Sequence, residues 1–154
     1  MHYTDAGTVS RHYRRRPPLD GFAAGLAATA AMSGVLVAAA AAGLMRDQPP
    51  VLIARKFLPN LPEPLLQASS WVAHFGYGAA GGVLHHVVQR SRPSVAKGAA
   101  YGLALWAASY EGWVPVAGVL PPAHADDRRR VATMVTAHLV YGAVLGALAR
   151  RPRR

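Results

Sequence analysis

Residues 21–45 read GFAAGLAATAAMSGVLVAAAAAGLM and contain no Asp, Glu, Lys or Arg. A helix rises about 1.5 Å per residue, and the hydrocarbon core of a bilayer is roughly 30 Å thick. The stretch is therefore long enough to cross a membrane as one helix. Because it is rich in Ala and Gly, it also leaves open a soluble, Ala-rich helical bundle.

Three further stretches of similar length follow, and together with the first they set the fold class. They are residues 69–89, 98–120 and 131–149. Two of them carry no Asp, Glu, Lys or Arg, whereas the middle one carries Glu111. Four successive stretches of this kind favour the membrane over the soluble bundle. We expect a single all-α domain over residues 1–154, an integral membrane four-helix bundle with four transmembrane helices.

The second and fourth stretches share a motif. Residues 73–79, AHFGYGA, recur as AHLVYGA at residues 137–143, and the common frame is A-H-x-x-Y-G-A-x-x-G-x-L. Each hairpin also passes through a pair of prolines, Pro49-Pro50 or Pro121-Pro122. Ala and Gly would match often by chance in this composition, but His, Tyr and a Pro pair in register would not. We expect two repeated transmembrane hairpins, related by a pseudo-two-fold axis along the membrane normal.

Every predicted span contains a G-x-x-x-G pair. In lipid no hydrophobic effect drives helices together, so small residues that let backbones approach supply the van der Waals contact. We therefore expect a tightly packed bundle, or oligomerisation through such a face. The glycines predicted to pack helices are Gly21, Gly25, Gly78, Gly82, Gly98, Gly102, Gly142 and Gly146.

The chain is strongly basic, with 17 Lys and Arg against 7 Asp and Glu and a formal net charge of +10. Basic residues near span ends stay in the cytoplasm, and eleven on one side against six on the other predict cytoplasmic N and C termini. Residues 1–20 and 150–154 then form basic cytoplasmic tails that contact anionic lipid headgroups, not nucleic acid. A cleaved signal peptide at the N terminus is the alternative.

Residues 46–68 are predicted to form an outer interfacial loop, because they contain five prolines and one short apolar run. A brief amphipathic helix would lie there in the headgroup plane. It would bury Val51, Leu52 and Phe57, while Arg55 and Lys56 meet phosphates.

Polar and ionisable side chains inside the predicted spans are the candidates for function, because each is costly in lipid unless it has a partner. They are His74, Tyr77, Glu111, His138 and Tyr141. Counted along straight helices, the two histidines and the glutamate all lie in the outer half of the membrane. We therefore expect an intramembrane polar cluster of His, Glu and Tyr side chains.

Three interpretations of this cluster stay open. In the first, each histidine bonds a neighbouring helix or the tyrosine one turn away, which is a purely structural arrangement. In the second, the cluster responds to protons or conducts them, because imidazole titrates near neutrality. In the third, His74 and His138 are axial ligands of a b-type haem, although no arginine in the spans is placed for its propionates.

The sequence contains few of the residue combinations on which common enzymes depend. The chain has no Cys, which excludes disulfides, thiolate metal sites and thiol catalysis. The spans hold a single Glu, no Asp and no recognisable nucleophile beside a base. We expect a non-catalytic membrane component that is structural or proton-responsive. We expect no metal, and no cofactor unless haem binds. The protein would act within the lipid bilayer as a homo-oligomer or as a subunit of a membrane complex.

Pieces of all four spans resemble the YagU-like family of small bacterial inner-membrane proteins of unassigned function. The matching pieces are GLAATAAM at residues 25–32, HFGYG at 74–78, YGLALW at 101–106 and HLVYG at 138–142. The resemblance implies a multi-pass protein of the bacterial inner membrane. It implies no reaction, and it makes His74, His138 and Glu111 the residues to follow.

Overall fold

The computed structural model describes residues 18–89 and 93–149, and every element within them is helical. The all-α prediction is confirmed for this part of the chain. The predicted tail 150–154, residues 1–17 of the predicted tail 1–20, and Arg90 and Arg92 lie outside the described residues. The elements are α1 (Pro18–Ala41), α2 (Pro49–Phe57), α3 (Glu63–Val88), α4 (Val95–Trp106), a π-helical segment (Ala107–Trp113), α5 (Val114–Val116), a 3-10 turn (Ala123–Ala125) and α6 (Arg128–Ala149).

The helix ends differ from the predicted spans 21–45, 69–89 and 131–149 because local signals decide them. The first helix ends at Ala41, where Gly43 takes a φ of 69° in the left-handed region. The second long helix already begins at Glu63, directly after Pro62. The last begins at Arg128, because the Asp127 carboxylate accepts hydrogen bonds at 3.0 Å from the backbone N–H groups of Arg129 and Arg130 in the first turn.

The predicted span 98–120 needs a larger correction, because it is not one regular helix. α4 ends at Trp106, and the chain widens into the π-helical segment. Within that segment Gly112 leaves helical geometry, with φ −98° and ψ −106°. Pro115 follows closely; it lacks an N–H and its ring crowds the preceding turn, so the regular ladder cannot continue. The predicted span is therefore interrupted between Ala107 and Pro115.

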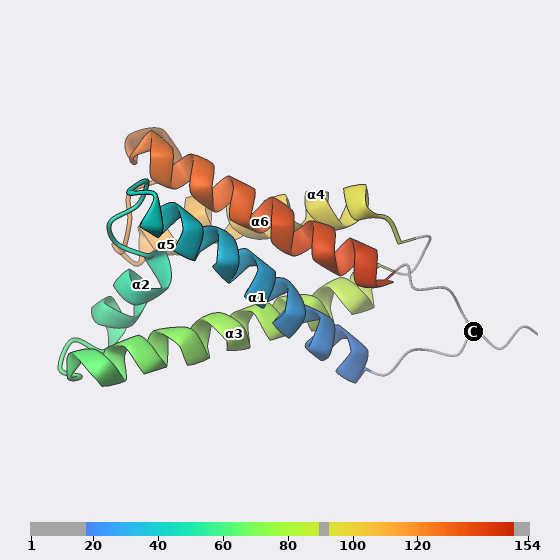
Figure 1. Ribbon diagram of the computed structural model, residues 1–154, viewed down its shortest axis with the longest axis horizontal. Helices are drawn as coiled ribbons and strands as arrows, with labels where there is room; N and C mark the ends of the chain where they lie inside the picture. Colours follow the sequence, from blue (N-terminus) through green and yellow to red (C-terminus); the bar gives the residue numbers. More distant parts are fainter. Residues whose placement is uncertain (1–17, 90–92, 150–154) are drawn as a thin grey trace, which may run out of the picture.

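Among the described helices, α1 and α6 are the two that are long and apolar enough to cross a membrane. This criterion rests on length and composition. The starts of α1 and α4 and the ends of α3 and α6 lie at one end of the molecule, whereas α2 and α5 lie at the other (Figure 1). The four long segments therefore alternate in direction.

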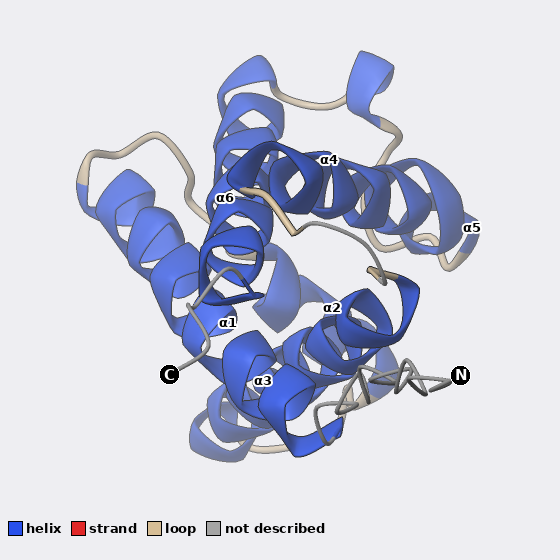
Figure 2. Ribbon diagram, turned by 90° about the vertical axis from the view of Figure 1, so that its right-hand side faces the viewer, coloured by secondary structure: helices blue, strands red, loops and turns tan. Residues whose placement is uncertain are grey.

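The helices pack unevenly around α1. It lies along both α3 and α6, and α4 lies along α6, but α3 makes little contact with either α4 or α6. An end-on view shows α4 and α6 on one side and α3 on the other, with α1 between them (Figure 2). Leu36, Tyr141 and Leu145 are the largest apolar side chains that are fully buried. The space between α3 and the α4/α6 pair is where the cavity described below lies.

The predicted packing glycines all lie at close contacts between helices. A Cβ on Gly25 would come 2.6 Å from the carbonyl oxygen of Gly78, so α1 and α3 touch backbone to backbone. A Cβ on Gly98 would meet the carbonyl oxygen of Gly142 in the same way across α4 and α6. A Cβ on Gly78 would collide with the Thr29 hydroxyl. The other close glycines are Gly21, Gly82, Gly102 and Gly146.

The predicted interfacial loop 46–68 contains the short helix α2, which lies on the bundle. Leu52 packs against the core, whereas Phe57 is 59% exposed on the surface of the protein, so its burial in the headgroup region stays a prediction. Arg55 pairs with Glu63 at 3.1 Å, which joins α2 to the start of α3. Hydrogen bonding from Gln67, followed by the charge of Arg55, lowers the pKa of the Glu63 carboxyl.

Candidate functional site

A cavity of about 200 Å³ lies where α3 diverges from α4 and α6. Its walls come from α1, α3, the π-helical segment and α6. Helix α2 contributes Pro49, Pro50 and Ile53, so it lines one side of the cavity. Most of the remaining lining is apolar, including Leu36, Leu105 and Met134. Mostly apolar cavities with a few polar groups are the usual form of a binding site.

Four of the five predicted polar residues line this cavity. His74 and Tyr77 reach it from α3, and His138 and Tyr141 reach it from α6. The two histidines occupy equivalent positions of the sequence motif. The structure therefore brings one histidine from each predicted hairpin to a common space.

His138 is 6% exposed, and its ring is held by its own helix. Its Nδ1 lies 2.8 Å from the carbonyl oxygen of Met134, one turn earlier. A carbonyl can only accept, so Nδ1 carries the proton of the neutral ring. That leaves Nε2 with a lone pair, able to accept a proton or a hydrogen bond.

His74 is placed differently from its motif equivalent. Its Nε2 is buried and has no hydrogen-bond partner. Its ring lies among aromatic side chains, edge-on to Phe75 at 6.0 Å and to Trp71 at 6.3 Å between ring centroids. A buried ring nitrogen without a protein partner is a costly arrangement that a water molecule, an ion or a ligand would relieve.

The two motif tyrosines also differ. Tyr141 is 1% exposed, and its hydroxyl donates to the carbonyl oxygen of Gly78 at 2.6 Å. Tyr101 on α4, which sequence reasoning did not single out, donates to Gly81 at the same distance. Tyr77 is 44% exposed. α1 packs extensively on both α3 and α6, whereas α4 packs mainly on α6, so the two halves of the motif meet different neighbours.

Glu111 does not join the histidines. It lies in the π-helical segment, is exposed, and is not among the residues that line the cavity. Its Oε1 accepts a hydrogen bond from the backbone N–H of Ala123 at 3.0 Å. The carboxylate thus holds the 3-10 turn before α6, and the predicted His/Glu cluster becomes a histidine pair.

A second polar network, missed by sequence reasoning, lies beside the cavity. The Tyr110 hydroxyl, from a ring that lines the cavity, donates to the Asp126 carboxylate. The same carboxylate pairs with Arg130 at 2.7 Å, and its side chain is 4% exposed. The i, i+4 spacing of Asp126 and Arg130 could have indicated the ion pair, but nothing in the sequence pointed to Tyr110.

The Ser and Thr hydroxyls of the cavity donate hydrogen bonds to backbone carbonyls. Thr29 donates to the carbonyl oxygen of Gly25 at 2.8 Å, and Ser109 donates to that of Leu105 at 2.9 Å. Both groups are thus engaged by their own helix. Within residues 18–89 and 93–149, no group of three or more His, Asp or Glu side chains could hold a metal ion.

A b-type haem does not fit this cavity. Sites for drug-sized ligands measure about 300–1,000 Å³, and this cavity measures about 200 Å³. Its lining contains no Lys or Arg to pair with propionates. The Met134 bond would orient His138 suitably as an axial ligand, but the space and the charge partners are missing.

Comparison with known proteins gives one match. A family model described as a family of unknown function, DUF6789, matches residues 15–154. No curated protein and no solved structure matches the chain. The resemblance to YagU-like proteins is tested by none of these comparisons.

Proposed function

Since the chain belongs to the DUF6789 family of unknown function, we propose its role from its own geometry. It is a small, non-catalytic, multi-pass protein of the bacterial inner membrane whose packing responds to protons through His74 and His138. The observation that carries the proposal is that these two motif-equivalent histidines line one apolar cavity.

Membrane placement is supported by more than the two apolar helices. On α3, large apolar side chains point away from the protein: Val72 is 74% exposed and Val88 is 65% exposed. Surfaces of this kind suit lipid better than water. We propose that α1, α3, the α4-to-α5 segment and α6 are the four spans, with both termini cytoplasmic.

The two-hairpin arrangement is supported by the glycine contacts. Gly25 meets Gly78 within the α1/α3 pair, and Gly98 meets Gly142 within the α4/α6 pair. The same kind of small-residue contact thus closes each hairpin, as tight packing in lipid requires.

The proton response follows from the cavity lining. Besides the histidines, its titratable residues are Tyr77 on α3, Tyr110 in the π-helical segment and Tyr141 on α6. No Asp, Glu, Lys or Arg lines it. A proton taken up by either imidazole would therefore place a positive charge in an apolar space without an acidic partner, which destabilises the closed arrangement. Opening would occur where α3 has the fewest contacts, along α4 and α6.

Thermal unfolding of the purified protein in neutral detergent, followed between pH 8 and pH 5, tests this proposal. We expect the unfolding midpoint of the unaltered chain to fall as the pH drops through about 6.5, the range in which imidazole titrates. The double variant His74→Gln with His138→Gln, which keeps polarity but cannot titrate there, should lose this dependence.

The matched control is His124→Gln, because His124 is exposed in the 3-10 turn and does not line the cavity. This variant should keep the pH dependence of the unaltered chain. If the double variant keeps it too, the histidine pair is not the proton-responsive site.

A further inference from the structure

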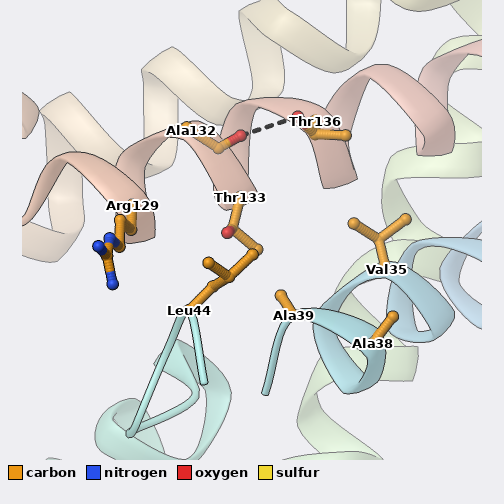
Figure 3. Close-up of a pocket in the computed structure, with 8 residues that line it drawn as sticks. All are labelled: Val35, Ala38, Ala39, Leu44, Arg129, Ala132, Thr133 and Thr136. Carbon is orange, nitrogen blue, oxygen red and sulfur yellow. Dashed lines mark hydrogen bonds between the residues drawn. The ribbon is translucent and has the colours of Figure 1, made fainter. Parts of the chain in front are cut away.

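A second hollow lies away from the histidines, as an open groove of about 560 Å³ between α1 and α6. Helix α1 and the turn after it contribute one wall, and the first two turns of α6 contribute the other (Figure 3). Small side chains help to make it hollow: Ala38 and Ala39 line it from α1, and Ala132 lines it from α6.

The groove joins the two helices that are apolar enough to span a membrane. Its open side would therefore face hydrocarbon at the end of the bilayer where α6 begins. From Arg129 to Thr136 the groove follows α6 for about 10 Å, at the helical rise of about 1.5 Å per residue. That length suits the part of one acyl chain that lies nearest to the headgroup.

The charged residue of the groove lining, Arg129, lies at one end, whereas Thr133 lies in the middle. Arg129 is exposed at the start of α6, and no ion pair involving its side chain is found in the described part of the chain. The neighbouring Arg130 is instead paired with Asp126. At the far end, the Thr136 hydroxyl is turned back to the carbonyl oxygen of Ala132 at 2.9 Å, which leaves that end apolar (Figure 3).

We propose that this groove binds an anionic phospholipid, with one acyl chain between α1 and α6 and the phosphate on Arg129. Charge complementarity selects the occupant: a cation at the interface end and a mostly apolar channel below it match the two parts of such a lipid. This inference rests on the membrane placement proposed above.

Native mass spectrometry of the full chain in neutral detergent, titrated with dioleoyl phosphatidylglycerol or dioleoyl phosphatidylcholine, tests the site. We expect one phosphatidylglycerol molecule to bind more tightly than phosphatidylcholine. Arg129→Gln should weaken phosphatidylglycerol binding about fivefold and phosphatidylcholine binding less, because the choline cation offsets the charge of its phosphate.

Arg128→Gln is the matched control, because Arg128 is exposed beside Arg129 and does not line the groove. It should bind phosphatidylglycerol like the unaltered chain. Ala38→Leu and Ala132→Leu fill the apolar part and should weaken both lipids. Millimolar inorganic phosphate should not displace the lipid, since the acyl chain supplies part of the binding.

Equal losses in Arg128→Gln and Arg129→Gln, no loss in either, or displacement by inorganic phosphate would each overturn the lipid site. Both Leu variants binding like the unaltered chain would also overturn it. The membrane placement is measured separately, by cysteine labelling in cells of the loops at the two ends of the helices. A failure of the membrane placement can therefore be told apart from a failure of the lipid site.

Discussion

The hydroxyl of Tyr141 on α6 donates a 2.6 Å hydrogen bond to the carbonyl oxygen of Gly78 on α3. Tyr101 on α4 makes an equally short bond to Gly81, one turn further along α3. Since α3 otherwise makes little contact with α4 and α6, these bonds tie it to the other side of the cavity. The acceptors are carbonyls of a Gly-rich turn, where no side chain obstructs the approach of the tyrosine rings.

Tyr141→Phe removes one of these ties and leaves the Gly78 carbonyl without that donor. We expect a loss of about 1 kcal/mol in the free energy of unfolding, the usual net value of one hydrogen bond. Reversible unfolding in mixed detergent measures it. Tyr77→Phe, at the equivalent motif position but 44% exposed, should change the free energy of unfolding far less. Equal losses in the two variants would contradict the assigned role of Tyr141.

Gly25→Ala tests the close contact of α1 with α3. The new Cβ would lie 2.6 Å from the Gly78 carbonyl oxygen and 2.8 Å from the Cα of Ala79, so the helices must separate. We expect a loss of about 1–3 kcal/mol, as for other overpacked contacts. Gly34→Ala on the same helix is the control, because nothing lies within 4 Å of its Cβ position. It should be neutral or slightly stabilising through helix propensity. A similar loss in both variants would contradict the account, because it could not come from the close contact at Gly25.

Glu111→Gln separates the observed arrangement from the expected His/Glu cluster. Because the carboxylate bonds the Ala123 N–H and does not line the cavity, the pH dependence of unfolding should stay as in the unaltered chain. The amide of Ala123 should exchange faster with deuterium, since a neutral side chain is a weaker acceptor. If Glu111→Gln loses the pH dependence of unfolding, Glu111 belongs to the proton-responsive site and the account is contradicted.

Asp126→Asn breaks the network beside the cavity. Arg130 would lose its charged partner and the Tyr110 hydroxyl its carboxylate acceptor. We expect a loss of about 3 kcal/mol in the free energy of unfolding, at the low end for a broken buried pair because Arg130 is 22% exposed. Glu63→Gln, which breaks an exposed pair with Arg55, is the control and should have little effect. A small loss in Asp126→Asn would mean that water replaces the carboxylate.

The helical segments and their glycine contacts could be predicted because both depend on local patterns. Long uncharged runs give the helices, and glycines four apart lie on one helix face, as Gly98 and Gly102 do against α6. The break in the third segment was harder to place. Pro115 signals it, but the non-helical residue is Gly112 and the ladder already widens from Ala107 onward.

The site could be predicted in part for the same reason. The motif placed His74 and His138 at corresponding positions, and the structure brings both to one cavity. Glu111 was expected beside them because its depth was counted along a straight helix, whereas the π-helical segment turns its side chain toward Ala123. Tyr110 was missed because its partner Asp126 lies in a loop whose path depends on packing between distant parts of the chain.

The central claim is that this chain lies in a lipid bilayer. Cysteine labelling in intact cells tests this claim most directly. The natural sequence has no Cys, so single substitutions can be read without background. Asn60→Cys and Ala125→Cys should react with a membrane-impermeant maleimide in intact cells, whereas Ser91→Cys should react only after the membrane is opened. Labelling of all three in intact cells, or recovery of the chain in the soluble fraction without detergent, would contradict the account.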